Sequence, residues 1–348
     1  MTMMTLAARA MQIAQLNLFF AQTGMTTLAQ RRLQGPRKPN WSWRFESAVR
    51  VMAGLTPNHA DILVDEIRNP FDRVTEIPVR HRVRVEPVQI GGVPGEWVAV
   101  PHTDSAHVLL YLHGGGYISG SPRTYRMLIA EIARATQLRV LAPDYRLAPE
   151  NPYPAAVEDA QTAYFWLLEQ GIAPENIVVA GDSAGGGLTI ALMLTLRETG
   201  APLPACGVCL SPWFDLTMAG ESIQANAGLD YLNEHMIRAA VQMYIQDHDP
   251  HDPLISPLYA DLHGLPPLLI QAGTVDLLFD DAKRFAQRAK AAGVDITLEL
   301  AENMVHVFQF FYLVSPEARQ AIQQIGRFAR AHIGKETKYA RPLENSAR

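Results

Sequence analysis

Short β-branched segments alternate with longer amphipathic segments from about residue 82 onward, and this alternation constrains the fold more than any other feature. A regular succession of strands and helices is typical of a mostly parallel sheet with helices packed on its faces. The predicted strands are 82–90, 94–100, 107–113, 138–143, 176–182, 206–211, 267–273 and 296–302. The predicted helices are 122–135, 154–169, 184–198, 278–292 and 316–333. The pattern therefore predicts an α/β fold.

Two stretches depart from this alternation. Residues 1–80 are mostly helical in pattern, and 213–250 form a long excursion between two strands. Additions of this kind commonly cover the carboxyl ends of the strands, where open α/β sheets bind ligands. We expect 1–80 to be an N-terminal helical cap segment and 81–335 to be the α/β domain, with 213–250 as a cap insertion. The polar, aperiodic residues 336–348 are expected to form a mobile tail.

Composition and charge exclude several classes of protein. The 348 residues are 48% hydrophobic and 19% charged, which suffices for a large core. Lys and Arg number 30 against 35 Asp and Glu, a net charge of −5, and no long basic run is present. This balance argues against a nucleic-acid partner or an acidic membrane surface. No stretch of about 18 apolar residues could span a bilayer, so a soluble protein is expected.

The N-terminal residues predict an amphipathic helix rather than a cleaved signal. Ala10, Ile13, Leu16 and Phe20 recur at helical spacing. Polar residues such as Gln12 interrupt any apolar core of a signal peptide, and a basic cluster is missing before it. We therefore expect the protein to remain in the cytoplasm.

The cysteines and the clustered histidines carry weak metal signals. Cys206 and Cys209 have CxxC spacing, but they fall in a predicted strand, where positions i and i+3 point to opposite faces. We interpret them as buried, inert thiols suited to a reducing compartment. His248 and His251 lie in a segment broken by prolines, with no helix to align them on one ion. The sequence therefore predicts no metal site.

The strongest chemical signal is a serine between two glycines. The strand 176–182 leads into Gly181-Asp182-Ser183-Ala184-Gly185 and then into a helical pattern. A G-x-S-x-G sequence in this strand, turn and helix context is typical of a nucleophile elbow, in which small residues allow a strained turn. The alternative is that these residues are only the glycine-rich start of a helix, without a catalytic role. We predict that Ser183 is a nucleophile exposed at the end of the sheet.

A second glycine-rich segment follows an earlier strand. His113 is succeeded by Gly114, Gly115 and Gly116, directly after the strand 107–113. Acyl transfer builds negative charge on a carbonyl oxygen, and backbone N–H groups free of side chains can converge on it. We predict an oxyanion hole from this glycine loop and the amide of Ala184. A plain flexible turn is the alternative.

An acid and a base follow the last two strands. Asp276 comes after the strand 267–273, and His306 comes after 296–302. The order Ser, Asp, His is the one that this kind of fold uses. Asp280 and Asp281 are alternatives for the acid, but they fall in a first helical turn, where acidic residues complement the helix dipole. Asp276 and His306 are the predicted partners of Ser183.

Together these motifs resemble the hormone-sensitive lipase-like, family IV bacterial carboxylesterases. The matching segments are HGGGY (113–117), APDYRLAPENPYPAAVEDA (142–160), GDSAGG (181–186), SPWFDL (211–216), DPLISPLYADLHGLPPLLIQAG (252–273), TVDLL (274–278) and HVF (306–308). The resemblance implies an α/β-hydrolase fold, with a mostly parallel eight-stranded sheet and a helical cap. It also implies a serine carboxylesterase for short- to medium-chain esters, with the triad Ser183, Asp276 and His306. No cofactor is implied, and a homodimer is the expectation from similar enzymes. The family often has Gly where this chain has Val307.

Residues around the motifs provide further candidates. Three charged groups, Asp144, Arg146 and Glu150, are expected to brace the oxyanion loop through ion pairs. Aromatic residues beside the motifs are candidates for a substrate pocket, with core packing as an equal alternative. They are Tyr117, Trp213, Phe214 and Phe308.

Two alternatives to ester hydrolysis stay open at the level of the sequence. A lactone hydrolase or an amide-directed deacylase would use the same nucleophile and oxyanion donors. A non-catalytic ligand-binding receptor would keep the fold and lose the chemistry.

Overall fold

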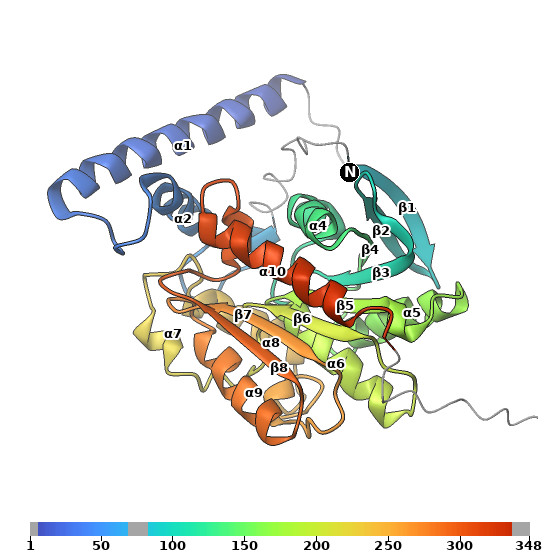
Figure 1. Ribbon diagram of the computed structural model, residues 1–348. Helices are drawn as coiled ribbons and strands as arrows, with labels where there is room; N and C mark the ends of the chain where they lie inside the picture. Colours follow the sequence, from blue (N-terminus) through green and yellow to red (C-terminus); the bar gives the residue numbers. More distant parts are fainter. Residues whose placement is uncertain (1–5, 69–82, 336–348) are drawn as a thin grey trace, which may run out of the picture.

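The computed structural model of the protein, which describes residues 6–68 and 83–335, contains one sheet of eight strands (Figure 1). They are β1 (Arg84–Ile90), β2 (Val93–Ala99), β3 (Asp104–Leu112), β4 (Leu138–Pro143), β5 (Ile177–Asp182), β6 (Cys206–Leu210), β7 (Leu268–Gly273) and β8 (Ile296–Ala301). Their order in the sheet is β1-β2-β4-β3-β5-β6-β7-β8. β2 pairs antiparallel with both of its neighbours, and the remaining pairs are parallel. The expected α/β architecture is confirmed.

Five helices cover the two faces of the sheet. They are α4 (Pro122–Thr136), α5 (Ala155–Glu169), α6 (Ala184–Glu198), α9 (Phe279–Ala291) and α10 (Pro316–His332), close to the predicted ranges. α4 and α10 pack on one face and α5, α6 and α9 on the other. Serine caps start α4 and α10: the Ser121 and Ser315 side chains each accept a backbone hydrogen bond, and a proline follows each of them. Short 3₁₀ helices span Pro174–Asn176, Pro257–Tyr259 and Phe308–Phe311.

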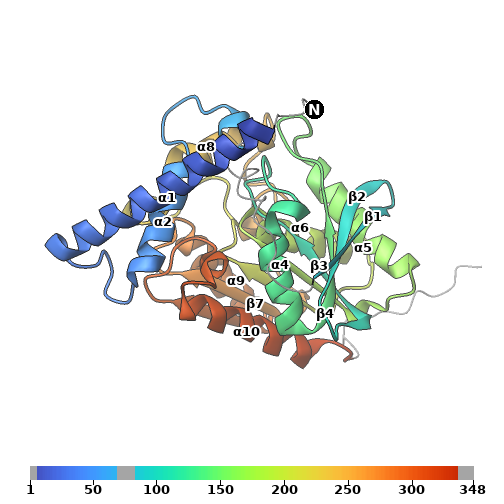
Figure 2. The same cartoon turned by 90° about the horizontal axis from the view of Figure 1, so that it is seen from above.

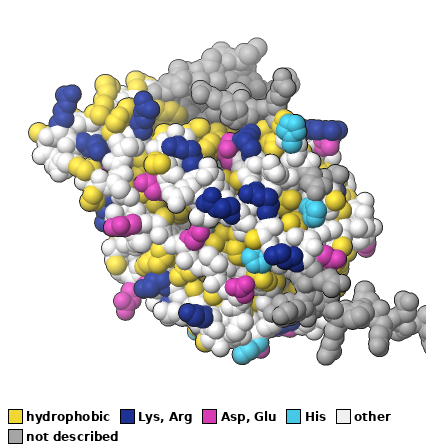
Figure 3. Space-filling view, viewed as in Figure 1, with side chains coloured by type: hydrophobic (Ala, Val, Ile, Leu, Met, Phe, Trp, Pro, Cys, Tyr) yellow, Lys and Arg dark blue, Asp and Glu magenta, His cyan; other side chains and the backbone are white. Residues whose placement is uncertain are grey.

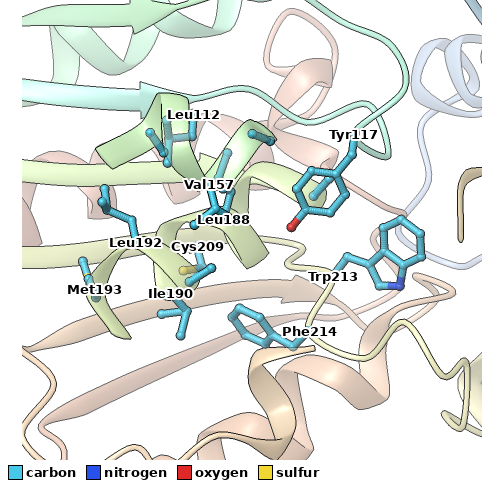
Figure 4. Packing of buried hydrophobic residues seen from close by; sticks show 14 of the residues in the cluster. Leu112, Tyr117, Val157, Leu188, Ile190, Leu192, Met193, Cys209, Trp213 and Phe214 are labelled. Carbon is cyan, nitrogen blue, oxygen red and sulfur yellow. The ribbon is translucent and has the colours of Figure 1, made fainter. Parts of the chain in front are cut away.

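The two faces of the sheet have separate cores because successive side chains of a strand point to opposite faces. Val108, Leu110 and Leu112 of β3 pack against the helices α5 and α6, whereas Leu109 and Tyr111 pack against α4 and α10. Figure 4 shows part of the first cluster.

The two cysteines follow the same alternation. Cys209 belongs to the α5 and α6 side and Cys206 to the α4 and α10 side, and both thiols are free and buried. The prediction that they point to opposite faces is confirmed.

The two segments outside the alternation contain the remaining helices. They include α1 (Leu6–Gln34) and α2 (Trp43–Leu55) near the N-terminus, and α7 (Ser222–Ala225) and α8 (Glu234–Ile245) in the 213–250 excursion; residues 64–68 are helical as well. The two segments contact each other, since Thr56 Oγ1 donates to the Tyr231 carbonyl at 3.0 Å and Asn233 Nδ2 donates to the Pro57 carbonyl at 2.9 Å. Figure 2 shows α1, α2 and α8 gathered on one side of the molecule, away from β1 and β2.

The surface seen in Figure 3 has no block of charge of one sign. Basic and acidic side chains are interspersed on it, and hydrophobic side chains gather along the 18–34 part of α1. Leu18, Met25 and Leu33 are among the exposed apolar residues of that helix. Among the described residues, no helix combines the length and apolar character needed to cross a membrane. The predicted tail, 336–348, lies outside the described residues.

Candidate active site

Ser183 occupies a strained turn between β5 and α6. Its backbone has φ 52° and ψ −121°, in a region that side-chain-bearing residues rarely adopt. The chain passes so closely here that a Cβ on Gly181 would lie 2.2 Å from the Gly185 carbonyl oxygen, and one on Gly185 would lie 2.0 Å from the Leu112 carbonyl oxygen. The two flanking glycines are therefore a steric requirement of this turn. The turn is the strand-to-helix geometry that the G-x-S-x-G sequence predicts. The prediction that Ser183 is exposed was wrong, because the residue is only 8% exposed and lines a cavity.

The glycine loop after β3 runs alongside this turn. Gly115 and Gly116 have φ of +111° and +65°, and a Cβ on Gly115 would lie 2.2 Å from the Ser119 carbonyl oxygen. The Gly114 amide is already engaged, because it donates to Asp182 Oδ1 at 3.0 Å. The prediction that Gly114 belongs to the oxyanion donors is therefore corrected: its amide holds the loop in place, and Gly115, Gly116 and Ala184 remain as candidate donors.

His306 and Asp276 come together after neighbouring parallel strands, β8 and β7. His306 Nδ1 lies 3.0 Å from Asp276 Oδ1 and 3.1 Å from Oδ2, and both side chains are buried. Burial alone lowers the pKa of His306, but the Asp276 charge and hydrogen bond, with Asp230 and Asp182, raise it, and the net change is upward. Because Nδ1 faces the carboxylate, Nε2 is the nitrogen left to exchange a proton with another group.

Ser183 and His306 line the same cavity, of about 620 Å³. Within the described part of the chain, no hydrogen bond joins Ser183 Oγ to His306. Catalytic hydrogen bonds of this kind often tighten only when substrate binds. Gly115 and Gly116 also line the cavity, so the predicted nucleophile, base and oxyanion loop face one space.

The walls of this cavity come from segments far apart in the sequence. Met52 and Ile67 reach it from the N-terminal segment, and Tyr231, Met236 and Ala240 are among those that reach it from the 213–250 excursion. Residues of α4 and of the segment 310–312 also line it. Residues of both segments therefore line the cavity. Their apolar character suits the hydrocarbon part of a small ligand.

Most of the predicted pocket aromatics are core residues instead. Trp213 does line the cavity, but Tyr117, Phe214 and Phe308 are not among its lining residues. Tyr117 stacks on Tyr244 with ring centroids 3.9 Å apart, and Phe214 packs 4.1 Å from Phe285. Figure 4 shows Tyr117 and Phe214 within the buried cluster.

Phe308 belongs to a third hydrophobic cluster, with Trp41 and Phe45. The pocket predictions for Tyr117, Phe214 and Phe308 were therefore wrong, since adjacency to a motif in sequence does not fix the direction of a side chain.

The charged residues of the DYRLAPE segment (144–150) support the oxyanion loop only in part. Arg68 pairs with Glu150 at 2.7 Å and also donates to the Ile118 carbonyl, so this pair reaches the loop. Arg146 pairs instead with Glu158 and Asp159 of α5.

Asp144 is exposed and makes no ion pair within the described residues. Tyr145, between these two residues, contacts the start of the oxyanion loop directly: its hydroxyl donates to the His113 carbonyl at 2.6 Å. The ion-pair prediction is therefore correct for Glu150 and wrong for Arg146 and Asp144.

Two buried carboxylates beside the site were not predicted to have a role. Asp182 accepts hydrogen bonds from Tyr111 Oη at 2.7 Å and from Gly114 N, and burial raises its pKa to about 6. Asp230, in the excursion, accepts hydrogen bonds from the backbone amide of His306. Asp182 lies inside the G-x-S-x-G motif, so the sequence could have indicated it, whereas no local sequence pattern marks Asp230.

Comparison with known proteins identifies the family. The alpha/beta hydrolase fold family matches residues 109–310. An acetyl-hydrolase of Streptomyces hygroscopicus is 44% identical over 252 residues, which are 72% of this chain and 84% of that protein. An esterase of Acinetobacter venetianus is 35% identical over 292 residues, which are 83% of this chain and 96% of that protein.

The solved structures that resemble this chain indicate the same kind of protein. The crystal structure of an esterase from the bacterial hormone-sensitive lipase family has 45% sequence identity and a TM-score of 0.80, and the match covers 84% of this chain and 99% of that one. The relatives are named as an acetyl-hydrolase and as esterases, all of them enzymes, which does not favour the receptor alternative. The chain therefore belongs to the alpha/beta hydrolase fold family, as one of the bacterial carboxylesterases related to hormone-sensitive lipase.

Proposed function

We propose that this carboxylesterase works through a serine nucleophile, with Ser183, His306 and Asp276 as its catalytic triad. The observation that carries the proposal is the buried hydrogen bond between His306 Nδ1 and Asp276, at 3.0 Å, beside a cavity that Ser183 also lines. A carboxylate on Nδ1 fixes the tautomer whose Nε2 accepts a proton. The strained turn at Ser183 supports its role as the nucleophile.

The reaction has two acyl-transfer steps. His306 Nε2 takes the proton of Ser183 as Oγ attacks the ester carbonyl, and the imidazolium then protonates the departing alcohol. A water molecule repeats the attack on the acyl-enzyme, with His306 again as base, and the carboxylic acid leaves Ser183. Asp276 holds the tautomer of the imidazole and stabilises the imidazolium.

The oxyanion of each tetrahedral intermediate would be held by backbone amides. Gly115 and Gly116 line the cavity, and Ala184 is the first residue of α6, where amides have no partner within the helix. Donors aimed at the developing charge are each worth about 10² to 10³ in rate. Gly114 supports this set through its bond to Asp182 and is not part of it.

The substrate we propose is a short- to medium-chain carboxylic ester. A cavity of about 620 Å³ lies within the range of small-ligand sites, and most of its side chains are apolar. We also propose that 1–80 and 213–250 act together as the cap of an 81–335 hydrolase domain, because both contribute walls to this cavity. The cytoplasmic location and the homodimer stay predictions from the sequence.

Initial rates on p-nitrophenyl esters from acetate to palmitate test the proposal. The wild type should show its highest kcat/KM on short or medium chains, and Ser183→Ala should lose on the order of 10⁶ in kcat. Ser119→Ala is the matched control, because Ser119 lines the same cavity but donates its hydroxyl to the Gly115 carbonyl. Its kcat should fall by no more than about tenfold. Near-normal hydrolysis by Ser183→Ala would reject the triad.

A further inference from the structure

A second buried carboxylate lies against the two loops that present Asp276 and His306. Asp230 belongs to the 213–250 excursion and is 5% exposed. Its Oδ2 accepts a hydrogen bond from the Leu277 amide at 3.1 Å, and both of its oxygens lie 3.2 Å from the His306 amide nitrogen. Oδ1 also accepts from the Tyr231 amide at 2.7 Å. One side chain of the excursion thus binds the backbone of both catalytic loops.

Neighbouring residues of the excursion hold the loop after β7 as well. Asn226 Nδ2 donates to the Asp276 carbonyl at 2.8 Å, and Ser222 Oγ donates to the Leu277 carbonyl at 2.7 Å. These two contacts reach only one of the loops. Asp230 alone among the three also reaches His306, so the relative position of acid and base depends on it.

The charge of Asp230 also acts on the site. The titratable groups that face it are Asp276 after β7, His306 after β8 and Tyr231 beside it in the chain, and His306 is further influenced by Asp182. Burial, together with the Asp276 charge, raises the pKa of Asp230. In return, its carboxylate raises the pKa of His306. A buried carboxylate is retained at little net cost where several N–H groups donate to it.

We propose that Asp230 is a positioning residue for ester hydrolysis. It holds the backbone at Leu277 and His306, so that the Asp276 carboxylate and the His306 imidazole stay aligned, and its negative charge stabilises the imidazolium that forms during each acyl transfer. Asp230 touches neither the substrate nor the reacting atoms. The inference rests on the proposed Ser183, Asp276 and His306 triad.

Neutral variants of the whole chain test this role. Asp230→Asn keeps the size of the side chain and removes its charge. Asp230→Ser is a second neutral variant, which avoids placing an amide NH₂ against the Leu277 and His306 N–H groups. The matched control is Asp281→Asn, because Asp281 is also buried and accepts from backbone amides of the excursion, at Phe214 and Asp215, but does not contact His306. For each variant, kcat, KM, the pH profile of kcat/KM and the thermal midpoint are measured.

We expect both Asp230 variants to lower kcat by about tenfold or more, while KM changes by less than about threefold. The acid limb of their kcat/KM profile should move to lower pH by about half a unit or more, because the imidazolium loses a nearby negative charge. Asp281→Asn should lower the thermal midpoint and leave the acid limb in place.

Two results would overturn the proposal. One is a wild-type kcat and acid limb in the Asp230 variants, and the other is an equal shift of the acid limb in Asp281→Asn. Ser183→Ala, assayed in parallel, separates this outcome from a failure of the triad itself: if it retains activity, the proposed function fails whatever Asp230 does.

Discussion

Tyr145 donates its hydroxyl to the carbonyl oxygen of His113 at 2.6 Å, and the two rings stack with centroids 4.2 Å apart. Burial lowers the pKa of His113 to about 4, so the imidazole is neutral at pH 7 and stacks without a charge to solvate. His113 is the last residue before the glycines of the oxyanion loop. The position of that loop therefore depends on an aromatic side chain from the DYRLAPE segment.

Tyr145→Phe is expected to lower kcat by about tenfold, because the freed His113 carbonyl lets the Gly115 and Gly116 amides shift from the oxyanion. Tyr164→Phe is the control: its buried hydroxyl also donates to a backbone carbonyl, that of Pro202, near the start of β6 and away from the cavity. Both variants should lose about 1 kcal/mol of unfolding free energy. Equal kcat values for the two variants would contradict this role of Tyr145.

Gly115→Ala should abolish most of the activity. A Cβ there would lie 2.2 Å from the Ser119 carbonyl oxygen, on a backbone with φ +111°, so the loop must move. We expect a loss of about 10² to 10³ in kcat. Gly171→Ala has the same kind of positive φ but nothing within 4 Å of its Cβ, so it should cost stability and keep kcat. Steady-state kinetics on a butyrate ester distinguish the two variants. Wild-type activity in Gly115→Ala would show that this loop does not supply the oxyanion donors.

The pH dependence should follow His306. The base must be neutral to accept the Ser183 proton, and its pKa is raised above 6.5, so kcat/KM should fall with decreasing pH at a midpoint above that value. Asp276→Asn removes the main charge that raises this pKa. Its midpoint should move to lower pH, and kcat should fall on the order of 10³- to 10⁴-fold.

The release of nitrophenol is read at its isosbestic wavelength, so that the indicator does not contribute to the profile. A wild-type midpoint below 6.5, or an unmoved midpoint in Asp276→Asn, would contradict the assignment.

Val307 should be a strained residue. It is β-branched and buried, and it adopts φ +39°, where Gly is more stable than Val. Its neighbour Val305 is equally buried but lacks a positive φ. We expect Val307→Gly to destabilise the protein by about 1 to 2 kcal/mol less than Val305→Gly, since both remove the same atoms. Urea unfolding at constant m measures the difference, and equal losses would show that Val307 is not strained.

The fold was predictable because its signals are local. A continuous run of apolar, β-branched residues marks buried strands such as β5, and a 3.6-residue period marks helices such as α10. The proximity of Ser183, Asp276 and His306 was predictable for a related reason: residues that follow the carboxyl ends of parallel strands lie at one edge of the sheet. Their catalytic roles stay a proposal.

The walls of the site could not be predicted in the same way. Tyr117 and Phe214 flank catalytic motifs, yet their side chains point into the core, because direction depends on backbone dihedral angles such as the φ of +62° at Tyr117. Asp230 reaches His306 across 76 positions of sequence, and no periodicity encodes a contact of that range. The hydrogen bond from the Gly114 amide to Asp182 spans 68 positions of sequence, so no local pattern could predict it.

The most direct test of the Ser183 nucleophile is to react the wild-type enzyme with a serine-directed fluorophosphonate and to map the modified peptide by mass spectrometry. A Ser183 nucleophile predicts one phosphonyl group per chain, on Ser183, with activity lost in proportion to labelling and no labelling of Ser183→Ala. Loss of activity with the group on another residue, or full labelling with activity retained, would contradict it.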